Sequence, residues 1–351
     1  MIKVVLVGDD SYEMYAKAFY EGFKELGYRD VTFFATNHYL ESEHFLHFMI
    51  FRVENKLAIG RRIRRINREL MKCVKEKSPD LLFLYSTRLI YEKTIKKIKE
   101  WGVTIFLYNN DDPFAGYYPP YYWRHYRNCL KYADVGFVYR YKNIEDYKKA
   151  GCERIELLRA YYIEKRNYYI AHVEKKVPEV VFLGHYEKDD RDIYLKRLLK
   201  EGIEIGLAEH AWKDFEVGNP LVIKIKNSLT LYNEILNSAK IAIVFLSKIN
   251  HDTYTRRCFE IPAVKTLMVA PYTDDIATLF KEDREIILYK NEKEFVEKIK
   301  YYLQHEKERE QIAEAGYNRL LKDGHEVKNR IQQVIDAYFL YQKDKNREDC
   351  T

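Results

Sequence analysis

The sequence has 351 residues, of which 47% are hydrophobic and 32% charged, and its formal net charge is +6. This composition excludes a disordered chain, and the length exceeds what one hydrophobic core usually holds, so two domains are expected. No apolar run approaches the roughly 18 residues that a membrane-spanning helix needs. The short apolar run at the N-terminus is followed by acids and not by a signal-peptide cleavage site, so we predict a cytoplasmic protein.

Short apolar runs alternate with helical patterns through the first half of the chain. Amphipathic stretches at about 12–26 and 56–77 predict helices. The runs that predict strands are 3–8, 30–36, 79–85, 103–110, 133–140 and 154–160. Near-continuous apolar runs are typical of parallel strands covered by helices on both faces, so this half predicts a Rossmann-like domain.

The same rhythm restarts after a polar, charged stretch at 163–177. Further strands are predicted at 179–184, 203–208, 240–246, 266–272 and 285–289. The predicted fold class is therefore α/β, with two Rossmann-like doubly wound parallel-sheet domains at 1–170 and 171–325. A C-terminal helix within 326–351 could pack back on the N-terminal domain. Such sheets bind ligands beyond the carboxyl ends of their strands, so two of them facing each other predict a ligand cleft.

The five cysteines are far apart, odd in number, and contain no CxxC pair. This spacing is typical of neither a disulfide framework nor a metal site. No DxD-like metal motif stands in a suitable place either. We therefore predict a protein that uses no metal and no other cofactor.

Glu260 stands between phenylalanine and isoleucine in a segment, 256–280, that otherwise has the pattern of a buried one. A carboxylate in the early turns of the helix predicted there can accept two hydrogen bonds from a ribose diol. Arg256 and Arg257, near the start of the same helix, suit a diphosphate. An i, i+4 ion pair between Glu260 and Arg256 explains the pattern equally well, so the residues alone leave both interpretations open.

Two carboxylates follow a strand of the first half. Asp111 and Asp112 come directly after the run at 103–110, at an edge where ligands are expected. Either could act as a base on an acceptor hydroxyl, or bind sugar hydroxyls. The alternative is a simple turn, because Asn, Asp and Pro together are turn formers.

Other polar residues occupy comparable positions. Gly8, Asp9 and Asp10 end the first predicted strand, where an acceptor loop would lie. The motif is not GxGxxG, so the dinucleotide-binding fingerprint is absent. His185 and His125 are further candidates for the catalytic base, and ordinary surface or structural histidines are the alternative.

Residues 256–321, from "RRCFEIPAV" to "AGYNRLL", resemble the C-terminal domain of the CgeB-like spore maturation glycosyltransferases, which belong to the GT-B group. The likeness lies in an ordered series: the "FEIPA" helix, a strand, an acidic loop with "LF", a strand, and helices containing "HEKERE" and "IAEAGYNR". It covers most of 180–325 and extends loosely to "YNNDDPF" at 108–114. The resemblance implies sugar transfer from a nucleoside diphosphate sugar, UDP or GDP, to a hydroxyl of a glycan, lipid or protein.

The resemblance also implies where the donor binds. Glu260 matches the acid that holds the donor ribose, and Gly184 matches the glycine of the loop that faces the phosphates. The donor-site residues so implied are Gly184, Arg191, Trp212, Thr253, Tyr254, Arg256, Arg257 and Glu260. Many retaining relatives carry a second acid about seven residues earlier, where this chain has Thr253. It is therefore open which residue makes the contact between that acid and the transferred sugar. The pattern around Glu260 nevertheless favours transfer with retention of configuration.

Two other functions remain as alternatives: a nucleotide-sugar epimerase on the same fold, and a non-catalytic nucleotide- or glycan-binding module. The strongest basic run, "GRRIRRINRELMK" at 60–72, places Ile63, Ile66 and Leu70 on one helical face and arginines on the other. A solvated helix surface explains it, and peripheral contact with an anionic membrane is the alternative. No nucleic-acid module is recognisable, so no such partner is expected.

Overall fold

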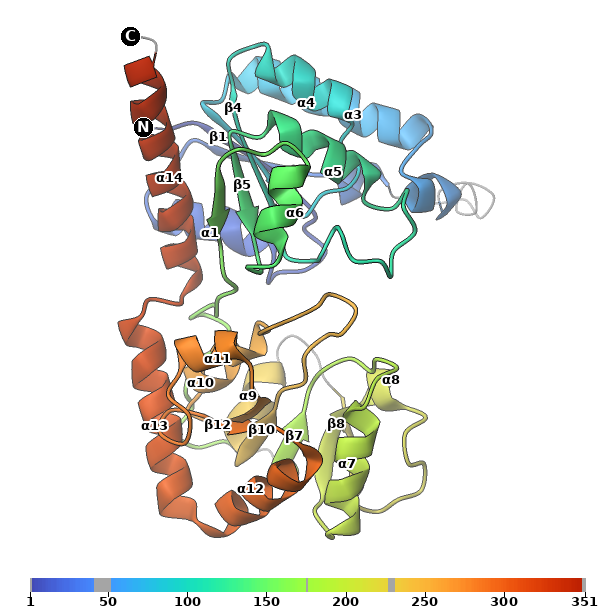
Figure 1. The fold of residues 1–351 in the computed structure, drawn as a ribbon, viewed down its shortest axis with the longest axis vertical. Helices are drawn as coiled ribbons and strands as arrows, with labels where there is room; N and C mark the ends of the chain where they lie inside the picture. Colours follow the sequence, from blue (N-terminus) through green and yellow to red (C-terminus); the bar gives the residue numbers. More distant parts are fainter. Residues whose placement is uncertain (1, 41–51, 175, 227–230, 349–351) are drawn as a thin grey trace. The chain divides into compact units, whose positions relative to one another are not determined.

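The computed structural model describes residues 2–40, 52–174, 176–226 and 231–348. The chain divides into two compact units, a first unit of Met1–Arg159 with Val327–Thr351 and a second unit of Ala160–Glu326 (Figure 1). The divisions lie near the predicted boundaries at 170 and 325. The second unit is therefore an insertion, in sequence, into the first.

The first unit contains a sheet of six parallel strands in the order β2-β1-β3-β4-β5-β6. Every strand predicted in this half is found. Their bounds are β1 (Val4–Gly8), β2 (Val31–Ala35), β3 (Leu81–Tyr85), β4 (Thr104–Asn109), β5 (Val135–Val138) and β6 (Ile155–Leu157). The strand order reverses between β1 and β3, which is the point of such a sheet where ligands bind.

Helices cover both faces of this sheet because alternate strand residues point to opposite sides. Val5, Leu82 and Ile105 pack into one cluster with the helices α3 and α4. Phe83 and Phe106 lie on the other face, where their rings contact Phe19 of α1 and Tyr338 of α14. The helices of this unit include α1 (Ala16–Glu25), η1 (Asn37–Tyr39), α3 (Arg61–Lys77), α4 (Glu92–Lys99), α5 (Arg124–Cys129), η2 (Leu130–Tyr132), α6 (Asn143–Lys149) and α14 (Val327–Glu348).

Two glycines determine where α3 begins and how closely α1 and α14 approach each other. The predicted helix at 56–77 becomes α3 only from Arg61 onward, because Gly60 has a φ of 109°, which interrupts the helix and favours glycine. Gly22 lets α1 and α14 approach closely, since a Cβ at that position would lie 2.4 Å from Cδ1 of Ile331. The last helix of the chain is in this way part of the first unit.

The second unit repeats the architecture, with six parallel strands in the order β12-β11-β10-β7-β8-β9. The bounds are β7 (Val180–Phe182), β8 (Ile205–Ala208), β9 (Val222–Ile225), β10 (Ile241–Ile243), β11 (Leu267–Pro271) and β12 (Ile287–Tyr289). Only β9 lacks a predicted counterpart. It is an edge strand in which Val222 and Ile225 are buried while Ile223 is exposed, so it has no continuous apolar run.

The helices of the second unit pack against this sheet around a separate core. Phe295 and Ile299 of α12 and Leu195 of α7 are fully buried against strand residues such as Val180 and Ile241. The helix bounds are α7 (Arg191–Lys200), α8 (Glu209–Trp212), α9 (Leu231–Ser238), α10 (Arg257–Ala263), α11 (Asp274–Leu279), α12 (Glu292–Gln304) and α13 (Glu306–Lys322). The strand order here reverses between β7 and β10.

The predicted pair of doubly wound parallel-sheet domains is confirmed. Within the described part of the chain, no helix combines the length and apolar character needed to cross a bilayer. Because each sheet reverses its strand order once, each unit offers one position where the loops after neighbouring strands diverge and leave room for a ligand. These two positions direct the search for the functional site.

Candidate functional site

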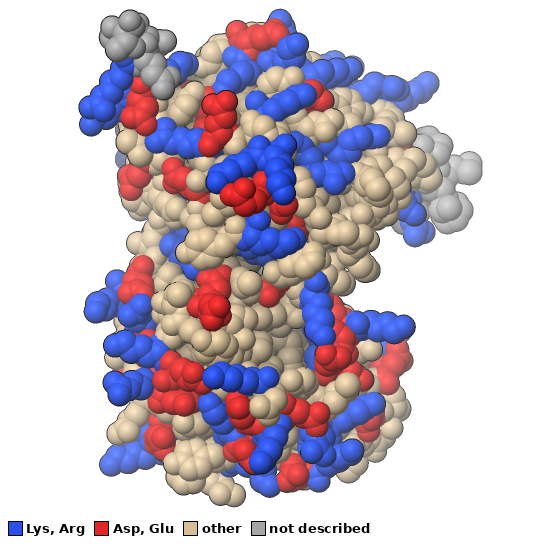
Figure 2. All heavy atoms as spheres, in the orientation of Figure 1, with Lys and Arg blue, Asp and Glu red and all other residues tan. Residues whose placement is uncertain are grey.

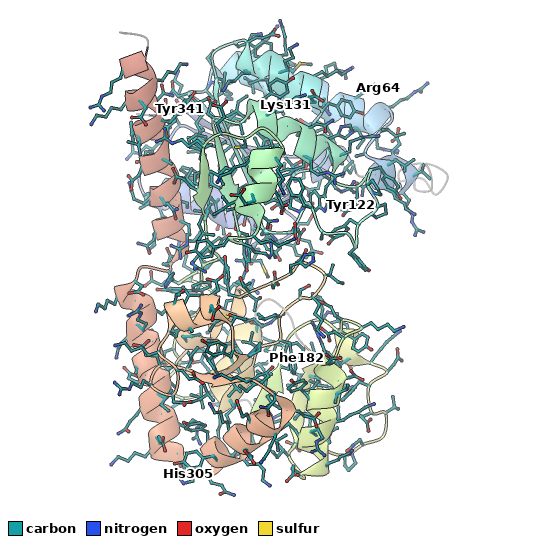
Figure 3. All side chains as sticks on the ribbon, in the orientation of Figure 1. Arg64, Tyr122, Lys131, Phe182, His305 and Tyr341 are labelled. Atoms are coloured by element: carbon teal, nitrogen blue, oxygen red, sulfur yellow. The ribbon has the colours of Figure 1, made fainter. Side chains whose placement is uncertain are left out.

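In the second unit, the loop after β7 meets helix α10 at the reversal of strand order. A Cβ at Gly184 would lie 2.9 Å from Nη2 of Arg257 and 2.3 Å from Cζ of Phe182, so only glycine leaves room there. The guanidinium carbon of Arg257 lies 5.6 Å from the centre of the Phe182 ring, whose position is labelled in Figure 3. The predicted residues Gly184 and Arg257 are thus brought together, with a positive charge at the carboxyl end of β7.

Glu260 is one turn further along α10 and is 5% exposed. Its Oε2 accepts a hydrogen bond from the Tyr232 hydroxyl at 2.9 Å. Burial, followed by the charge of Glu260, raises the pKa of Tyr232 well above its ordinary value, so the tyrosine stays protonated and donates. The guanidinium of Arg256 lies 4.6 Å from the ring centre of Tyr161, and the Glu260 carboxylate is held by the tyrosine and not by that arginine.

Arg166 was not singled out in the sequence because it lies in a polar stretch with the composition of a linker. Its guanidinium carbon is 5.5 Å from the ring centre of Tyr232, the residue that holds Glu260. Its Nε and Nη1 are buried and have no hydrogen-bond partner among the residues that the structure describes. Buried polar groups of proteins are nearly always paired, so this arginine is a candidate for contact with an anionic ligand.

His185 follows Gly184 and has an exposed side chain. Desolvation is the largest cause that lowers its pKa, and the nearby charges of Arg257, His210 and Arg191 lower it further. The imidazole is therefore neutral at pH 7. A neutral imidazole can accept a proton or a hydrogen bond from a ligand hydroxyl.

Three predicted donor contacts are wrong, because each side chain is buried and its polar group is already bound within the protein. Arg191 is 4% exposed and binds Asp189 through Nε and Nη2, both at 2.8 Å. Trp212 is 1% exposed, and its indole N–H donates to the carbonyl of Gly184 at 2.9 Å. The hydroxyl of Tyr254, a residue with no exposed surface, accepts the backbone N–H of Ala160 at 3.1 Å.

Two of them, Arg191 and Trp212, hold the loops of the site in place instead. Arg191 also donates to the carbonyl of His185 at 2.6 Å, so it fixes the segment that contains that histidine. Trp212 fixes the backbone of Gly184 in the same way. A search for charge and aromatic character in the sequence cannot separate such support from direct contact, because both use the same residue types.

Thr253 occupies the position at which many retaining relatives carry a second acid. Its hydroxyl donates to Oδ2 of Asp275 at 2.6 Å, and its carbonyl accepts the hydroxyl of Thr273, also at 2.6 Å. Asp275 belongs to the first turn of α11 and is 8% exposed. A carboxylate therefore does lie beside position 253, although it comes from a different element.

The first unit has a cavity of about 390 Å³ at the carboxyl ends of β1 to β4. The candidate residues Asp9 and Asp111 both line it. The remaining lining residues are Tyr12, Tyr15, Ala16, Thr36, Leu40, Asn55, Tyr85, Ser86, Thr87, Arg88, Leu89, Asn110, Tyr122 and Trp123. The cavity lies at the reversal of strand order between β1 and β3, and we call it the carboxyl-edge pocket.

Asp112 is next to Asp111 in sequence but is completely buried. Its Oδ1 accepts the backbone N–H of Phe114 at 2.9 Å and the Asn143 amide at 2.8 Å, and Oδ2 accepts Lys142 Nζ at 3.0 Å. The prediction that Asp112 is a catalytic base is therefore wrong, since a carboxylate so enclosed cannot reach an acceptor hydroxyl. The alternative, a turn-forming residue, fits this geometry.

Other first-unit candidates are also occupied. Asp10 accepts Asn37 Nδ2 at 2.6 Å and pairs with His38 Nε2 at 2.8 Å. Gly8 has no room for a side chain, because a Cβ would lie 2.3 Å from the Cβ of Ala16. His125 places Nε2 3.0 Å from the carbonyl of Ala58, so it is a structural histidine. Asp9, whose Oδ1 accepts the backbone N–H of Ser11 at 2.8 Å, and Asp111 both line the carboxyl-edge pocket, and this position makes them the first-unit candidates for contact with a ligand.

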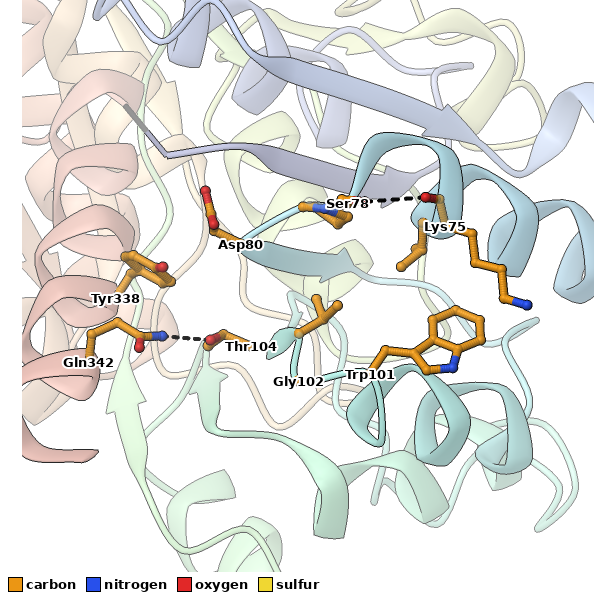
Figure 4. Close-up of a pocket in the computed structure, with 11 residues that line it drawn as sticks. Lys75, Ser78, Asp80, Trp101, Gly102, Thr104, Tyr338 and Gln342 are labelled. Atoms are coloured by element: carbon orange, nitrogen blue, oxygen red, sulfur yellow. Dashed lines mark hydrogen bonds between the residues drawn. The ribbon is translucent and has the colours of Figure 1, made fainter. Parts of the chain in front are cut away.

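A larger cavity, of about 500 Å³, lies at the opposite edge of the same sheet, near the amino ends of β3 and β4 (Figure 4). Polar groups at this cavity already have partners within the protein: Gln342 Nε2 donates to Thr104 Oγ1 at 2.7 Å, and Asp80 accepts the backbone N–H of Lys3, also at 2.7 Å. Ligands of doubly wound sheets bind at the other edge. Size alone therefore does not identify the site.

Metal ligands do not cluster in the parts of the chain that the structure describes: no three His, Cys, Asp or Glu side chains are grouped so that they could hold an ion. The positive charge near Glu260 comes from arginines. Such groups suit a diphosphate because guanidinium ions form charge-assisted hydrogen bonds with phosphate oxygens.

Comparison with known proteins supports this chemistry. Residues 191–336 match the family model described as "Glycosyl transferase-like". None of the curated proteins matches the sequence.

Similar solved structures span almost the whole chain. Sucrose-phosphate synthase from Thermosynechococcus elongatus has a TM-score of 0.70 at 10% identity, covering 98% of this chain and 100% of that chain. HepE from Anabaena, solved with UDP and glucose, has a TM-score of 0.66 at 11% identity, covering 96% and 99%. A protein from Listeria monocytogenes described as a UDP-N-acetylglucosamine 2-epimerase has a TM-score of 0.58 at 10% identity, covering 98% and 97%.

At these identities the structures show the fold, which is that of GT-B glycosyltransferases. The family match covers α7 to the first part of α14 and includes Arg257 and Glu260. Residues 191–336 therefore match a glycosyl transferase-like family model, within a chain whose fold is that of GT-B glycosyltransferases.

Proposed function

We propose that the protein transfers a sugar from a nucleoside diphosphate sugar, with UDP as the nucleotide, to an acceptor hydroxyl. The second unit binds the donor and the first unit binds the acceptor. The observation that carries the proposal is the buried carboxylate of Glu260, fixed by Tyr232 at 2.9 Å on the helix that also presents Arg257 beside Gly184. The solved complex of HepE with UDP supports UDP as the nucleotide.

The donor would be bound by complementary groups. Tyr232 occupies Oε2 of Glu260. No other described side chain is seen to donate to this carboxylate, which leaves Oε1 for a ribose hydroxyl. The guanidinium of Arg257 supports binding of the diphosphate, and the buried donors of Arg166 supply a second positive group. Charge that develops on the leaving diphosphate during transfer would be stabilised by these same groups.

On the acceptor side, Asp111 is the proposed base. It lines the carboxyl-edge pocket, whereas Asp112 is enclosed. A carboxylate at this position can accept the proton of the attacking hydroxyl and orient it. His185, neutral and close to Gly184, is proposed to contact the donor instead of the acceptor.

Two finer assignments belong to the same proposal. The ordered series at 256–321 supports membership of the CgeB-like branch. The pattern around Glu260, with Asp275 held by Thr253 at 2.6 Å, supports transfer with retention of configuration. The anomeric proton of the product, observed by NMR before it equilibrates, would report retention or inversion directly.

Calorimetric titration with UDP, GDP and ADP tests the donor assignment. Glu260→Gln should weaken UDP binding about 5- to 150-fold, or about 1–3 kcal/mol, because a buried hydrogen-bonding group loses its charge and one acceptor. Tyr232→Phe should have a smaller effect in the same direction. Glu297→Gln, on an exposed side chain of α12, is the matched control. Unchanged UDP affinity in Glu260→Gln would remove the ribose assignment.

The epimerase alternative has only the shared fold in its favour. Incubation with a UDP-sugar panel, with and without acceptor, distinguishes the two reactions. A transferase gives a new glycoside only when acceptor is present, whereas an epimerase converts the donor alone.

We also propose that residues 60–72 make peripheral contact with anionic lipid. Ile63, Ile66 and Leu70 are fully buried in the first-unit core, so α3 has no apolar face to insert into a bilayer. Its outer face is cationic and includes Arg64, which is labelled in Figure 3. Figure 2 shows lysine and arginine side chains over α3 and α4. The contact would therefore be electrostatic and sensitive to salt.

Cosedimentation with phosphatidylserine vesicles tests this surface. Binding at low salt should be lost at high salt, on vesicles of phosphatidylcholine alone, and in the double variant Arg64→Glu, Arg68→Glu. Equal binding to both kinds of vesicle would contradict an electrostatic contact.

A further inference from the structure

We infer that the carboxyl-edge pocket of the first unit binds an uncharged sugar ring, so that the acceptor is a neutral glycan or glycoside and not a sugar phosphate. This inference rests on the proposed function. It adds the chemical class of the acceptor, which neither the family match nor the similar structures determine.

The first observation is that two buried polar atoms at the pocket lack partners. Thr87 is 6% exposed and Trp123 is 4% exposed, and both line the pocket. Neither Oγ1 of Thr87 nor Nε1 of Trp123 has a hydrogen-bond partner among the described residues. An indole N–H only donates, whereas a threonine hydroxyl both donates and accepts. A ligand rich in hydroxyl groups can satisfy both, because each hydroxyl also donates and accepts.

The second observation is backbone strain next to these residues. Ser86 ends β3 with a φ of 47°, which a residue with a side chain rarely adopts. Its hydroxyl donates to Asn110 Oδ1 at 2.5 Å and accepts the backbone N–H of Asn110 at 3.2 Å. Strained residues of this kind concentrate at binding and catalytic sites. The loops after β3 and β4 are thus tied together at the pocket.

The third observation is the aromatic lining. Tyr12 is 58% exposed, and its ring lies 6.0 Å from the ring of Tyr15 in an edge-to-face arrangement. A large exposed aromatic residue at a pocket is typical of recognition, because its ring offers an apolar face while its hydroxyl remains in water. The C–H face of a pyranose ring is itself apolar and can stack on such a ring.

The charges of the pocket argue against a phosphate. Its charged lining residues are Asp9, Asp111 and Arg88, which sum to a net charge of −1. Arg88 is already engaged, since Nη1 donates to the Asn55 carbonyl at 2.6 Å and Nη2 donates to its Oδ1 at 2.8 Å. Burial lowers the pKa of this arginine, which indicates that its surroundings favour the charged form less than water does. A phosphate dianion would meet two carboxylates and an arginine that already donates two hydrogen bonds to Asn55.

A binding experiment on the full chain tests the inference. The probes are p-nitrophenyl glycosides of glucose, galactose, mannose and N-acetylglucosamine, compared with the 6-phosphate of each parent sugar, by saturation-transfer NMR and calorimetry. At least one uncharged glycoside should bind, and its affinity should exceed that of the matching phosphate by about 10-fold or more. Tyr12→Ala should weaken that binding by about 10-fold, and Thr87→Val by about 3-fold. Tyr141→Ala, on a tyrosine that is 56% exposed outside the pocket, should have no effect.

The outcomes separate this inference from the proposed function. Tighter binding of a sugar phosphate, no uncharged glycoside bound at about 20 mM, or binding indifferent to both pocket variants would overturn the inference, whether or not UDP binds. If glycosides bind and depend on Tyr12 while UDP does not bind, the pocket is a site for an uncharged sugar but glycosyl transfer fails. Tyr12→Ala changes an exposed side chain, so it should fold even if Thr87→Val does not.

Discussion

Both units contain a six-stranded parallel sheet that reverses its strand order once, but they carry different chemistry at the carboxyl ends of their strands. In the first unit, the reversal of strand order is lined by tyrosines, a tryptophan and the carboxylates of Asp9 and Asp111. In the second unit, the corresponding position holds Arg257, next to a glycine without room for a Cβ, and the buried Glu260. The topology therefore determines where a ligand binds, while the side chains on the loops determine which ligand it is.

The comparison also explains why cavity size alone does not identify the ligand site in this protein. In the first unit, the cavity at the amino edge is larger, about 500 Å³ against about 390 Å³, yet Gln342, Thr104 and Asp80 at this cavity already have hydrogen-bond partners within the protein. The smaller pocket contains buried polar atoms without partners. Unsatisfied hydrogen-bonding groups indicate a ligand more directly than volume does.

The largest expected effect distinguishes Asp111, the proposed base of the first unit, from its buried neighbour Asp112. Asp111→Asn should lower the rate of sugar transfer about 100- to 10,000-fold, because the base is lost, and should leave UDP affinity unchanged. Asp112→Asn is the matched control. It should lower the free energy of unfolding by about 1–3 kcal/mol while the folded fraction keeps its activity, since Asp112 only receives internal hydrogen bonds. Initial rates and urea denaturation measure the two quantities, and equal losses of rate would contradict the assignment.

The next effect compares two neighbouring arginines of the second unit. Arg257→Gln should weaken UDP binding about 10- to 100-fold, because a guanidinium is lost beside the proposed diphosphate site. Arg256→Gln should change it less than about 3-fold, since that guanidinium stacks on Tyr161. Calorimetry at fixed ionic strength compares them, and the reverse order would place the diphosphate at the other arginine.

A smaller effect is expected when the loop that contains Gly184 loses the support of Trp212. Trp212→Phe removes the hydrogen bond from the indole N–H to the Gly184 carbonyl and should cost about 1–2 kcal/mol of unfolding free energy. UDP affinity should fall only because Gly184 is less well held. Trp101→Phe, beside the amino-edge cavity of the first unit, controls for loss of an indole. A loss of UDP affinity larger than the loss of stability would restore Trp212 as a direct contact.

The smallest effect concerns pH. The pKa of His185 is lowered in the folded protein, so as pH falls through about 6.5 the unfolded chain takes up this proton more readily than the folded one. Wild type should therefore have a higher free energy of unfolding than His185→Gln at pH 7.5, and this difference should decrease towards pH 5.5. Bound UDP should oppose this loss, because a diphosphate favours the protonated imidazole. Denaturation at both pH values, with and without UDP, would detect it, and a pH-independent difference would contradict the shift.

Strands buried on both faces could be predicted from the sequence because their apolar runs are continuous, and all such runs became strands. The edge strand β9 was missed because Lys224 interrupts its apolar residues. Among the candidate donor-site residues, Glu260 could be singled out because a carboxylate in an apolar helix is unusual, and Arg257 because it lies near the start of the same helix. Gly184 was singled out only by the family resemblance.

The remaining site residues could not be distinguished by sequence. Asp111 and Asp112 are identical in type and adjacent, and only the direction of the chain after β4 exposes one and buries the other. Arg166 became a candidate only because its guanidinium lies near Tyr232 with two unpaired donors, which depends on the folding of distant segments. Arg191, Trp212 and Tyr254 needed their partners to be known before support could be separated from contact.

The return of α14 to the first unit has a consequence for synthesis on the ribosome. Ile331 packs so closely on Gly22 that the amino-terminal sheet receives one of its covering helices only from the last part of the chain. The second unit can complete its own sheet as soon as it emerges, whereas residues 1–159 must wait for α14. A nascent chain stalled before Val327 would therefore expose the apolar surface around Phe106 and Gly22 to chaperones, and premature termination there should be more damaging than the loss of a surface helix.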